Sequence, residues 1–243
     1  MKLERGAING IKFYHRKGFS DLKTLEEVIG HDCYQKRGLK IQEGQRWMDC
    51  GGNVGAFALL ACSKNASVEV YEPDPFNCEM IERNLKLNGF RAKIHQAALV
   101  HDDRESAVLF IGNNNNVWRN SLMKKWNDKG LRVPCLNFDE EVKRKGFTSC
   151  KMDIEGAEMP ILENSQVTFD HLVYEWSLDI DPFLPRLWKL LERQIQQYRV
   201  EAEWKRLRYF RRDYEFWPRG PSGVWLWFPC CTNVFCFKPT GVT

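Results

Sequence analysis

Long hydrophobic runs are missing from this chain of 243 residues. No stretch approaches the roughly 20 apolar residues that span a bilayer, so we expect no membrane-spanning helix. The first residues, MKLERGAINGIKFYHRKGF, lack the apolar core of a secretory signal peptide. Low-complexity tracts and obvious repeats are also missing, which argues against a disordered or a solenoid protein. We therefore expect a globular protein of the cytoplasm.

Paired cysteine motifs are missing as well. The nine cysteines are Cys33, Cys50, Cys62, Cys78, Cys135, Cys150, Cys230, Cys231 and Cys236. None of them forms a C-x-x-C pair, which excludes the common zinc-binding patterns, and we interpret them as reduced, mostly buried thiols. The net charge of +4 is small, so it permits an anionic partner without indicating one.

The composition, with 43% hydrophobic and 28% charged residues, suits one domain with a full hydrophobic core. We divide the chain into an N-terminal segment, residues 1–45, that caps one end of a cleft, and a main domain, residues 46–243. In the N-terminal segment we expect a strand over residues 11–14 and a helix capped by Asp21 that ends at Gly30. Four ring side chains of this segment could face the substrate or the cofactor, and a packing or surface role is the favoured interpretation for each: Tyr14, His15, His31 and Tyr34.

The most informative stretch is RWMDCGGNVGAFALLACSKNASVEVYE, residues 46–72. It predicts a strand that ends at Asp49, a glycine turn, a helix from Ala56 and a second strand that ends at Glu72. Glycines allow positive φ and close approach of a ligand, and a helix N-terminus attracts a negative group. An acid about 20 residues beyond such a turn commonly binds ribose hydroxyls. The order predicts the nucleoside-binding half of a doubly wound α/β domain.

The glycine turn reads G-G-N-V-G rather than the G-x-G-x-x-G of dinucleotide-binding folds. Asp49 places a negative charge beside the expected pocket, which disfavours a pyrophosphate but suits an ammonium or a sulfonium group. The pattern therefore resembles motif I of S-adenosylmethionine (SAM) methyltransferases, with Glu72 as the ribose-binding acid. The alternative is a glycine turn that binds no ligand.

Two further segments are expected beside the cofactor. Asp74 and Pro75 are typical of the start of a helix, which we expect to end at Asn88. A third strand over residues 92–95 leads to Gln96, whose side chain could contact the adenine. An ordinary turn is the alternative at that position.

A second informative stretch, CKMDIEGAE, covers residues 150–158. It predicts a strand that ends at Asp153 and a turn into the next helix. Ligands of open α/β sheets bind at the carboxyl ends of strands, so we expect Asp153 and Glu155 near the reacting group. Acids this close repel one another unless they act as a base, bind a divalent cation or cap a helix. Glu175, at the end of the next predicted strand, is a further candidate.

The remaining predicted elements are strands over residues 107–111, 131–136, 171–174, 200–204 and 232–237, and helices over residues 138–145 and 182–198. Between the last two strands, KRLRYFRRDYEFWPRGPSGVWLW is rich in arginine and aromatic residues. Aromatic rings stack on sugar faces, and arginine with aromatics also suits nucleotide sugars or nucleic acids. We interpret residues 205–231 as a substrate-facing insertion. A surface loop that packs its own aromatic side chains is the alternative.

The blocks MDCGGNVGAFALLA…VYEPDPFNCEMIERNLKLNG and CKMDIEGAEMPILEN resemble the FkbM-type methyltransferases, which are class I SAM enzymes. The resemblance covers about residues 46–170, and D-I-E-G-A-E is its more discriminating part. The family more often has Gly-Ala-Asn where this chain has Gly51-Gly52-Asn53. The resemblance implies a doubly wound, Rossmann-like α/β fold with a seven-stranded sheet, mostly parallel, whose last strand is antiparallel.

The motifs and the resemblance together predict the site residues. The cofactor-binding residues are Asp49, Gly51, Gly52, Asn53, Gly55, Phe57, Glu72, Pro73, Asp74, Gln96 and Ala97. The catalytic residues are Asp153, Glu155 and Glu175, and Asp153 and Glu175 are the candidate ligands of a divalent cation, Mg²⁺ or Mn²⁺.

The leading hypothesis from the sequence is SAM-dependent O-methylation of a hydroxyl on a sugar, a glycan or a nucleotide sugar. An alcohol is a poor nucleophile until it loses its proton, and Asp153 is the expected base. The alternative is methylation of RNA, DNA or a nucleotide, against which stand the small net charge and the lack of an N-P-P-[YF] motif. A domain without activity that serves as a binding scaffold is a third hypothesis, which the intact acids of both motifs disfavour.

Overall fold

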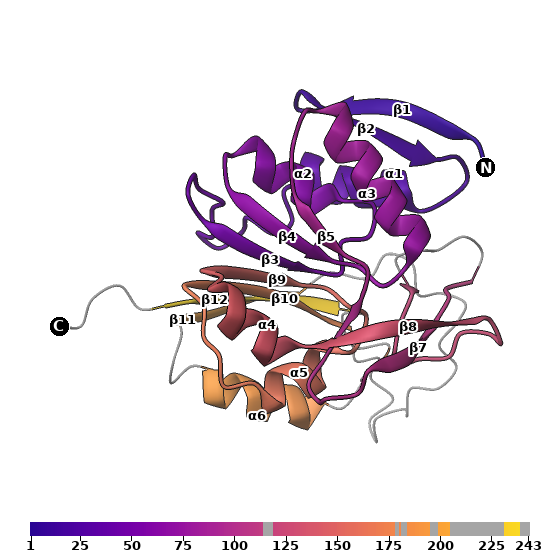
Figure 1. Ribbon diagram of the computed structural model, residues 1–243. Coiled ribbons are helices and arrows are strands. Elements are labelled where there is room, and N and C mark those ends of the chain that lie inside the picture. Colours follow the sequence, from indigo (N-terminus) through magenta and orange to yellow (C-terminus); the bar gives the residue numbers. More distant parts are fainter. Residues whose placement is uncertain (114–118, 178–179, 181–183, 195–198, 205–230, 239–243) are drawn as a thin grey trace, which may run out of the picture.

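A computed structural model describes residues 1–113, 119–177, 180, 184–194, 199–204 and 231–238 of the chain. Its main sheet contains β3 (Arg46–Cys50), β4 (Ser67–Tyr71), β5 (Lys93–His95), β9 (Ser149–Met152), β10 (His171–Ser177), β11 (Arg199–Trp204) and β12 (Cys231–Phe237). The strand order is β11-β12-β10-β9-β3-β4-β5 (Figure 1). β12 runs antiparallel to β10 and β11, and the other six strands are parallel to one another. The predicted α/β class with a mostly parallel sheet is confirmed.

The strand order reverses at β3. From this strand the chain builds β4 and β5 on one side, whereas β9 and β10 lie on the other side. The segments that follow β3, β4 and β9 therefore meet at one edge of the sheet. Open α/β sheets bind their ligands at such a switch point.

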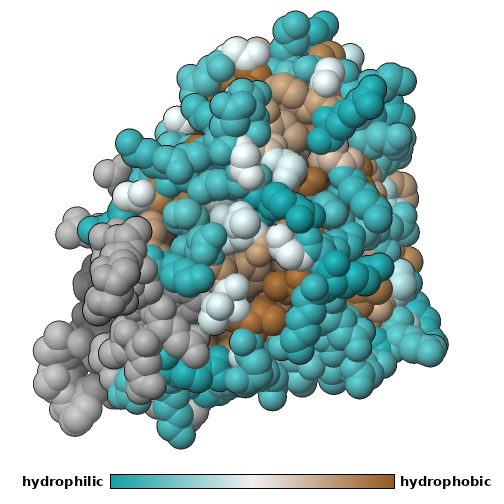
Figure 2. Space-filling model, turned by 60° about the vertical axis from the view of Figure 1, so that its left-hand side comes forward, coloured by the Kyte–Doolittle hydropathy of each residue, from teal (hydrophilic) through white to brown (hydrophobic). Residues whose placement is uncertain are grey.

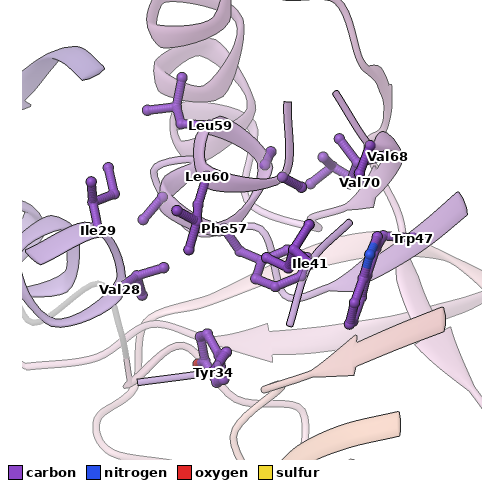
Figure 3. Close-up of a cluster of buried hydrophobic side chains, with 14 of the residues drawn as sticks. Val28, Ile29, Tyr34, Ile41, Trp47, Phe57, Leu59, Leu60, Val68 and Val70 are labelled. Carbon is purple, nitrogen blue, oxygen red and sulfur yellow. The ribbon is translucent and has the colours of Figure 1, made fainter. Parts of the chain in front are cut away.

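Helices cover both faces of the sheet (Figure 1). One face carries α1 (Asp21–Leu25), the π-helical turn η1 (Glu26–Gly30), α2 (Ala56–Ser63) and α3 (Pro75–Leu87), and the other carries α4 (Phe138–Lys145), α5 (Glu158–Asn164) and α6 (Leu184–Gln194). Successive side chains of β3 point alternately to the two faces of the sheet. Trp47 lies in the cluster under α2, which Figure 3 shows, and Met48 lies in the cluster under α4 and α5. The period of two in the strand thus builds two cores from one sheet.

A smaller sheet follows β5. It consists of β6 (Ala98–Val100), β7 (Ser106–Phe110) and β8 (Gly130–Asn137), in the order β6-β8-β7. The strands predicted over residues 107–111 and 131–136 are β7 and β8, which pair antiparallel. Part of the asparagine-rich stretch between them, residues 114–118, lies outside the described residues, as do residues 205–230 of the predicted insertion.

The N-terminal segment begins with an antiparallel hairpin of β1 (Leu3–Ile8) and β2 (Ile11–Arg16). Two asparagines of α3 bind the free edge of β2. The Asn84 side chain accepts a hydrogen bond from the main-chain N–H of Tyr14 (2.7 Å) and donates one to its carbonyl (3.2 Å). Asn88 makes the same two bonds with Lys12, at 2.9 and 2.6 Å. Each amide takes the place of a peptide group in a neighbouring strand, so the edge of the hairpin has its polar groups satisfied.

The predicted helix boundaries hold for α3 and α4 but not for the first helix. Asp74 caps α3 by accepting from the Phe76 N–H at 2.9 Å, and Gly146 ends α4 with φ +61°. The expected cap of the first helix, Asp21, lies inside α1, and Ser20 occupies the N-cap position. Asp21 does not cap the helix because its two carboxylate oxygens accept hydrogen bonds from the buried side chain of Arg16, each at 2.8 Å.

The outer surface of the described residues is mainly polar. In the view of Figure 2, hydrophilic residues cover most of the face, and apolar residues show between them in separate patches. Among the described helices, none combines the length and the apolar character that a membrane crossing requires.

The asparagine contacts with β2 predict a difference in stability. Asn84→Ala leaves the part-buried N–H and carbonyl of Tyr14 and the buried carbonyl of Val54 without their side-chain partner, so it should lower the free energy of unfolding by about 2 kcal/mol. Asn88→Ala removes the same kind of bonds at a half-exposed position, where water replaces them, and should cost less than about 1 kcal/mol. Urea unfolding of both variants measures the two losses. Equal losses would contradict the role of burial.

Candidate functional site

A crevice opens where β3, β4 and β9 end. Its lining comes from the glycine turn, the end of β4, the acidic turn after β9 and the small sheet: Gly51, Asn53, Tyr71, Glu72, Pro73, Asn77, Ala97, Ala98, Leu99, Leu109, Asn120, Leu122, Asp153, Ile154, Glu155 and Ala157. One side of it is polar and the wall from the small sheet is apolar. This division suits a ligand with a flat, poorly charged part and a charged part.

The glycines of the turn are required by the protein itself. Gly51 has φ +82°, and a Cβ there would lie 1.9 Å from the carbonyl oxygen of Asp153. A Cβ on Gly52 would lie 2.2 Å from the Val70 side chain. Sequence reasoning assigned these glycines to ligand approach, whereas the structure shows that they let the turn contact β4 and the acidic turn. The two motifs of the sequence therefore touch each other through main-chain atoms.

The start of α2 leaves its first amide groups without a side-chain cap. Gly55 stands at the N-cap with φ +86°, and no side chain accepts from the helix N-terminus. Asn53 also has positive φ, at +49°, and its buried Oδ1 has no hydrogen-bond partner. Uncapped helix N–H groups attract an anion, and an unpaired buried oxygen calls for a donor. The turn thus offers both halves of a site for a zwitterionic group.

Glu72 is held at the mouth of the crevice by three donors. Its Oε2 accepts from the main-chain N–H of Asn53 (2.7 Å), and its Oε1 accepts from the N–H of Asp74 (2.9 Å) and from the side chain of Asn77 (3.3 Å). Burial raises the pKa of Glu72 to about 7, and these hydrogen bonds oppose the rise. The carboxylate is therefore fixed in place before any ligand arrives.

Asp49 faces a lysine instead of the crevice. It is fully buried, does not line the crevice, and lies 3.1 Å from the ammonium of Lys151 in β9. Lys151 also donates to the carbonyl of Gly51 at 2.7 Å. Burial raises the pKa of Asp49, and the lysine opposes that rise. The expected contact of Asp49 with the cofactor stays a prediction: its carboxylate lies beside Lys151, and that lysine binds the glycine turn.

Asp153 is paired with a tyrosine of the N-terminal segment. The hydroxyl of Tyr34 donates to Asp153 Oδ2 at 2.5 Å. Burial, and then the negative charge of Asp153, raise the pKa of Tyr34 far above its usual value, so the tyrosine keeps its proton and donates. Glu175 contributes to the same shift, which places its charge close to Tyr34. Tyr34, for which the sequence favoured packing and left a place near the substrate as the alternative, therefore contacts a side chain that lines the crevice.

Glu158, the first residue of α5, binds the main chain of the acidic turn after β9. Its carboxylate accepts from the main-chain N–H groups of Ile154 (2.6 Å) and Gly156 (2.7 Å), and burial raises its pKa to about 8. Glu155 has φ +53°, and its carbonyl accepts from the Ser121 hydroxyl at 2.6 Å. Of the three acids in the turn, Glu158 is thus structural, whereas Asp153 and Glu155 line the crevice.

The structure brings together half of the predicted site residues. Those that line the crevice are Gly51, Asn53, Glu72, Pro73, Ala97, Asp153 and Glu155, and those that do not are Asp49, Gly52, Gly55, Phe57, Asp74, Gln96 and Glu175. The Phe57 ring packs in the core between Tyr34 and Trp47, as Figure 3 shows. Asp74 caps α3 and accepts from Asn120 at 2.8 Å, while Gln96 is exposed. Asp49, Phe57, Asp74 and Gln96 thus do not line the crevice, and their contact with the cofactor stays a prediction.

Sequence reasoning missed Asn77 and Lys151. Asn77 lies in the first turn of α3, a position that a helical pattern assigns to packing. Lys151 had a usable signal, because a lysine in a predicted central strand is rarely buried without an acidic partner. Asn120 lies in the stretch 118–122, whose polar and aromatic residues the sequence placed near the substrate, and it lines the crevice.

The described residues contain no group of three or more His, Cys, Asp or Glu side chains able to hold a metal ion. Asp153 and Glu175, the predicted metal candidates, are both close to Tyr34 but do not form such a group in the described part of the chain.

The pair of Asp49 and Lys151 predicts a large change in stability. Lys151→Met leaves a buried carboxylate without its cation and should lower the free energy of unfolding by about 3–5 kcal/mol. Because the pKa of Asp49 is already raised, acid should reduce this loss by protonating the carboxyl group.

The double variant Asp49→Asn, Lys151→Met serves as the control, since it removes both charges and should recover most of the loss. Urea unfolding at neutral and mildly acidic pH measures all three proteins. A double variant as unstable as the single one would show that the charge pair is not the cause.

Solved structures of low sequence identity resemble the fold. They include a dimethyladenosine transferase from Plasmodium falciparum (TM-score 0.49, 10% identity, 89% of this chain and 62% of that chain) and the C-terminal domain of precorrin-6Y C5,15-methyltransferase from Rhodobacter capsulatus (TM-score 0.49, 10% identity, 93% and 94%). A third is a tRNA (uracil-54, C5)-methyltransferase from Pyrococcus abyssi in complex with S-adenosyl-L-homocysteine (SAH) (TM-score 0.48, 14% identity, 97% and 44%). This chain thus spans less than half the length of the Pyrococcus enzyme. No curated protein matches the chain significantly.

The family comparison is more specific. The methyltransferase FkbM domain matches residues 49–200, which is more than half of the chain and includes both the glycine turn and the acidic turn. The chain belongs to the FkbM methyltransferase family.

Proposed function

We propose that this protein transfers the methyl group of SAM to a hydroxyl of a sugar, a glycan or a nucleotide sugar. The observation that carries the proposal is Asp153, a carboxylate that lines the crevice and accepts a hydrogen bond from Tyr34. An oxygen nucleophile needs a proton acceptor at the point of transfer, and Asp153 stands at the end of the strand next to the glycine turn.

The crevice fits SAM group by group. The uncapped N-terminus of α2 suits the carboxylate of the methionine part, and the unpaired Oδ1 of Asn53 suits its ammonium. Glu72 suits the ribose hydroxyls. The apolar wall that includes Ala97 and Leu99 suits the adenine ring. When bound, SAM supplies an electrophilic methyl group on a sulfonium.

The acidic turn then supports the transfer. Asp153 would take the proton of the acceptor hydroxyl as the acceptor oxygen bonds to the methyl carbon and the carbon–sulfur bond of the sulfonium breaks, which releases SAH. Tyr34 fixes the direction of the carboxylate, and its hydrogen bond leaves the second oxygen, Oδ1, for the acceptor. Glu155 lies on the same side of the crevice and suits a second hydroxyl of a sugar. Alignment of acceptor and methyl group in a crevice shielded from water is the main source of rate.

The N-terminal segment, residues 1–45, acts in this proposal as the cap that sequence reasoning expected, because it brings Tyr34 to Asp153. Residues 205–231 remain a predicted insertion that faces the substrate. We assign no step to Mg²⁺ or Mn²⁺, for which Asp153 and Glu175 remain the candidate ligands. A chelator arm in the assay below tests for a metal requirement.

The proposal predicts that Asp153→Asn lowers the rate of methyl transfer by about 10²–10⁴-fold. The affinity for SAH should stay nearly unchanged, because asparagine has the same shape and still accepts from Tyr34. Transfer of labelled methyl from SAM is measured with panels of glycans, nucleotide sugars and tRNA, each with a divalent cation and with a chelator. SAH affinity is measured by calorimetry.

The matched control is Asp170→Asn, an exposed aspartate just before β10, which should leave both quantities unchanged. Full activity of Asp153→Asn would remove Asp153 from the mechanism. Label that enters tRNA but no carbohydrate would overturn the substrate class in favour of the nucleic-acid alternative.

A further inference from the structure

Asn77 connects the ribose-binding carboxylate to the N-terminal hairpin. It lies in the first turns of α3, lines the crevice, and donates from Nδ2 to Glu72 Oε1 at 3.3 Å. Its other amide atom, Oδ1, accepts from Nη2 of Arg16 at 2.8 Å. Asn77 itself is only 1% exposed, so water does not compete for either atom.

The arginine decides which way this amide points. An asparagine side chain can turn over, which exchanges its acceptor oxygen and its donor nitrogen. A guanidinium only donates, so Arg16 can face the oxygen of Asn77 but not its NH₂ group. The NH₂ group is therefore directed to the opposite side, where Glu72 lies. The carboxylate of Glu72, which only accepts, favours the same orientation, and Arg16 adds the second contact that holds the amide in it.

Arg16 is in turn held rigidly by the N-terminal segment. Arg16 is 1% exposed. The carboxylate of Asp21 accepts hydrogen bonds from Nε, Nη2 and the main-chain N–H of Arg16, each at 2.8 Å. The guanidinium also lies 5.2 Å from the ring centre of Phe19. A buried ion pair adds little net stability compared with apolar residues of the same size. Its position against Asn77 gives this pair a role besides stability.

We propose that Arg16 and Asn77 are positioning residues of the cofactor site, in which Arg16 fixes the amide of Asn77 and Asn77 orients Glu72 toward the ribose hydroxyls of SAM. The inference rests on the proposed function, because it takes Glu72 as the ribose-binding acid. It also makes the hairpin part of the cofactor site, although no hairpin residue lines the crevice.

The proposal has a signature in the pH dependence of cofactor binding. Ribose hydroxyls donate to the charged form of Glu72, and burial sets the pKa of that group at about 7. The charged groups and thiols around it are Asp74, which raises the pKa, Cys78 on α3, and the Arg16–Asp21 pair behind Asn77. The Asn77 bond lowers the pKa by favouring the charged form. SAH affinity should therefore be full above this pKa and fall as acid protonates Glu72.

The test is calorimetric titration of the full chain with SAH between about pH 5.5 and about pH 9. In Asn77→Ala the midpoint of the affinity–pH curve should move up by about one pH unit, with about fivefold weaker binding at pH 7. Arg16→Lys keeps a cation for Asp21 but cannot reach both Asp21 and Asn77 with one ammonium, so its midpoint should move the same way.

Asn84→Ala is the matched control, because Asn84 is a buried asparagine of the same helix that binds the same hairpin without contacting Glu72. It should lower stability and leave the midpoint where the wild type has it. A shift in Asn84→Ala as large as that in Asn77→Ala, or no shift in Asn77→Ala, would overturn the inference. Wild-type protein that does not bind SAH at any pH would instead overturn the proposed function.

Discussion

The site depends on one buried cation, the ammonium of Lys151 at the centre of the sheet. It compensates Asp49 of the neighbouring strand and donates to the carbonyl of Gly51. Next to this lysine, the main-chain N–H of Asp153 donates a hydrogen bond to the carbonyl of Cys50 at 3.0 Å. The glycine turn and the acidic turn, which are about 100 residues apart in the chain, are thus joined by ionic and main-chain contacts. These contacts keep the cofactor-binding turn and the proton acceptor Asp153 at a fixed distance from each other. Transfer of a group between two bound molecules requires such a fixed distance.

The elements that follow a strong local pattern were predicted well. Asp74 with Pro75 marks the start of α3, and Gly146 marks the end of α4, because caps act within a few residues of the helix end. The order of strand, glycine turn, helix, strand and acid likewise places Asn53 and Glu72 in the crevice. These predictions need only local chemistry and the general rule for where parallel sheets bind ligands.

The side-chain directions that the sequence did not indicate have a common physical reason. Asp49, Phe57 and Tyr34 each belong to a segment that the sequence describes correctly, yet the direction of each side chain depends on a partner far along the chain. Asp49 turns to a lysine about 100 residues away, and Tyr34 to an aspartate 119 residues away. A single sequence contains no measure of such pairings. Residues 205–231 remain a prediction, since nearly all of them lie outside the described residues.

The contacts between α3 and the hairpin have a consequence for how members of this family diverge. In the hairpin, Asn84 and Asn88 bind main-chain atoms of Tyr14 and Lys12 and no side chain, so side-chain mutations at those two hairpin positions leave these hydrogen bonds intact. Arg16 is the exception, since its side chain makes the contact. The hairpin can therefore change its exposed side chains, and the surface that they form, during evolution. Among these three hairpin positions, Arg16 is the one whose side chain must be kept for the contact with α3.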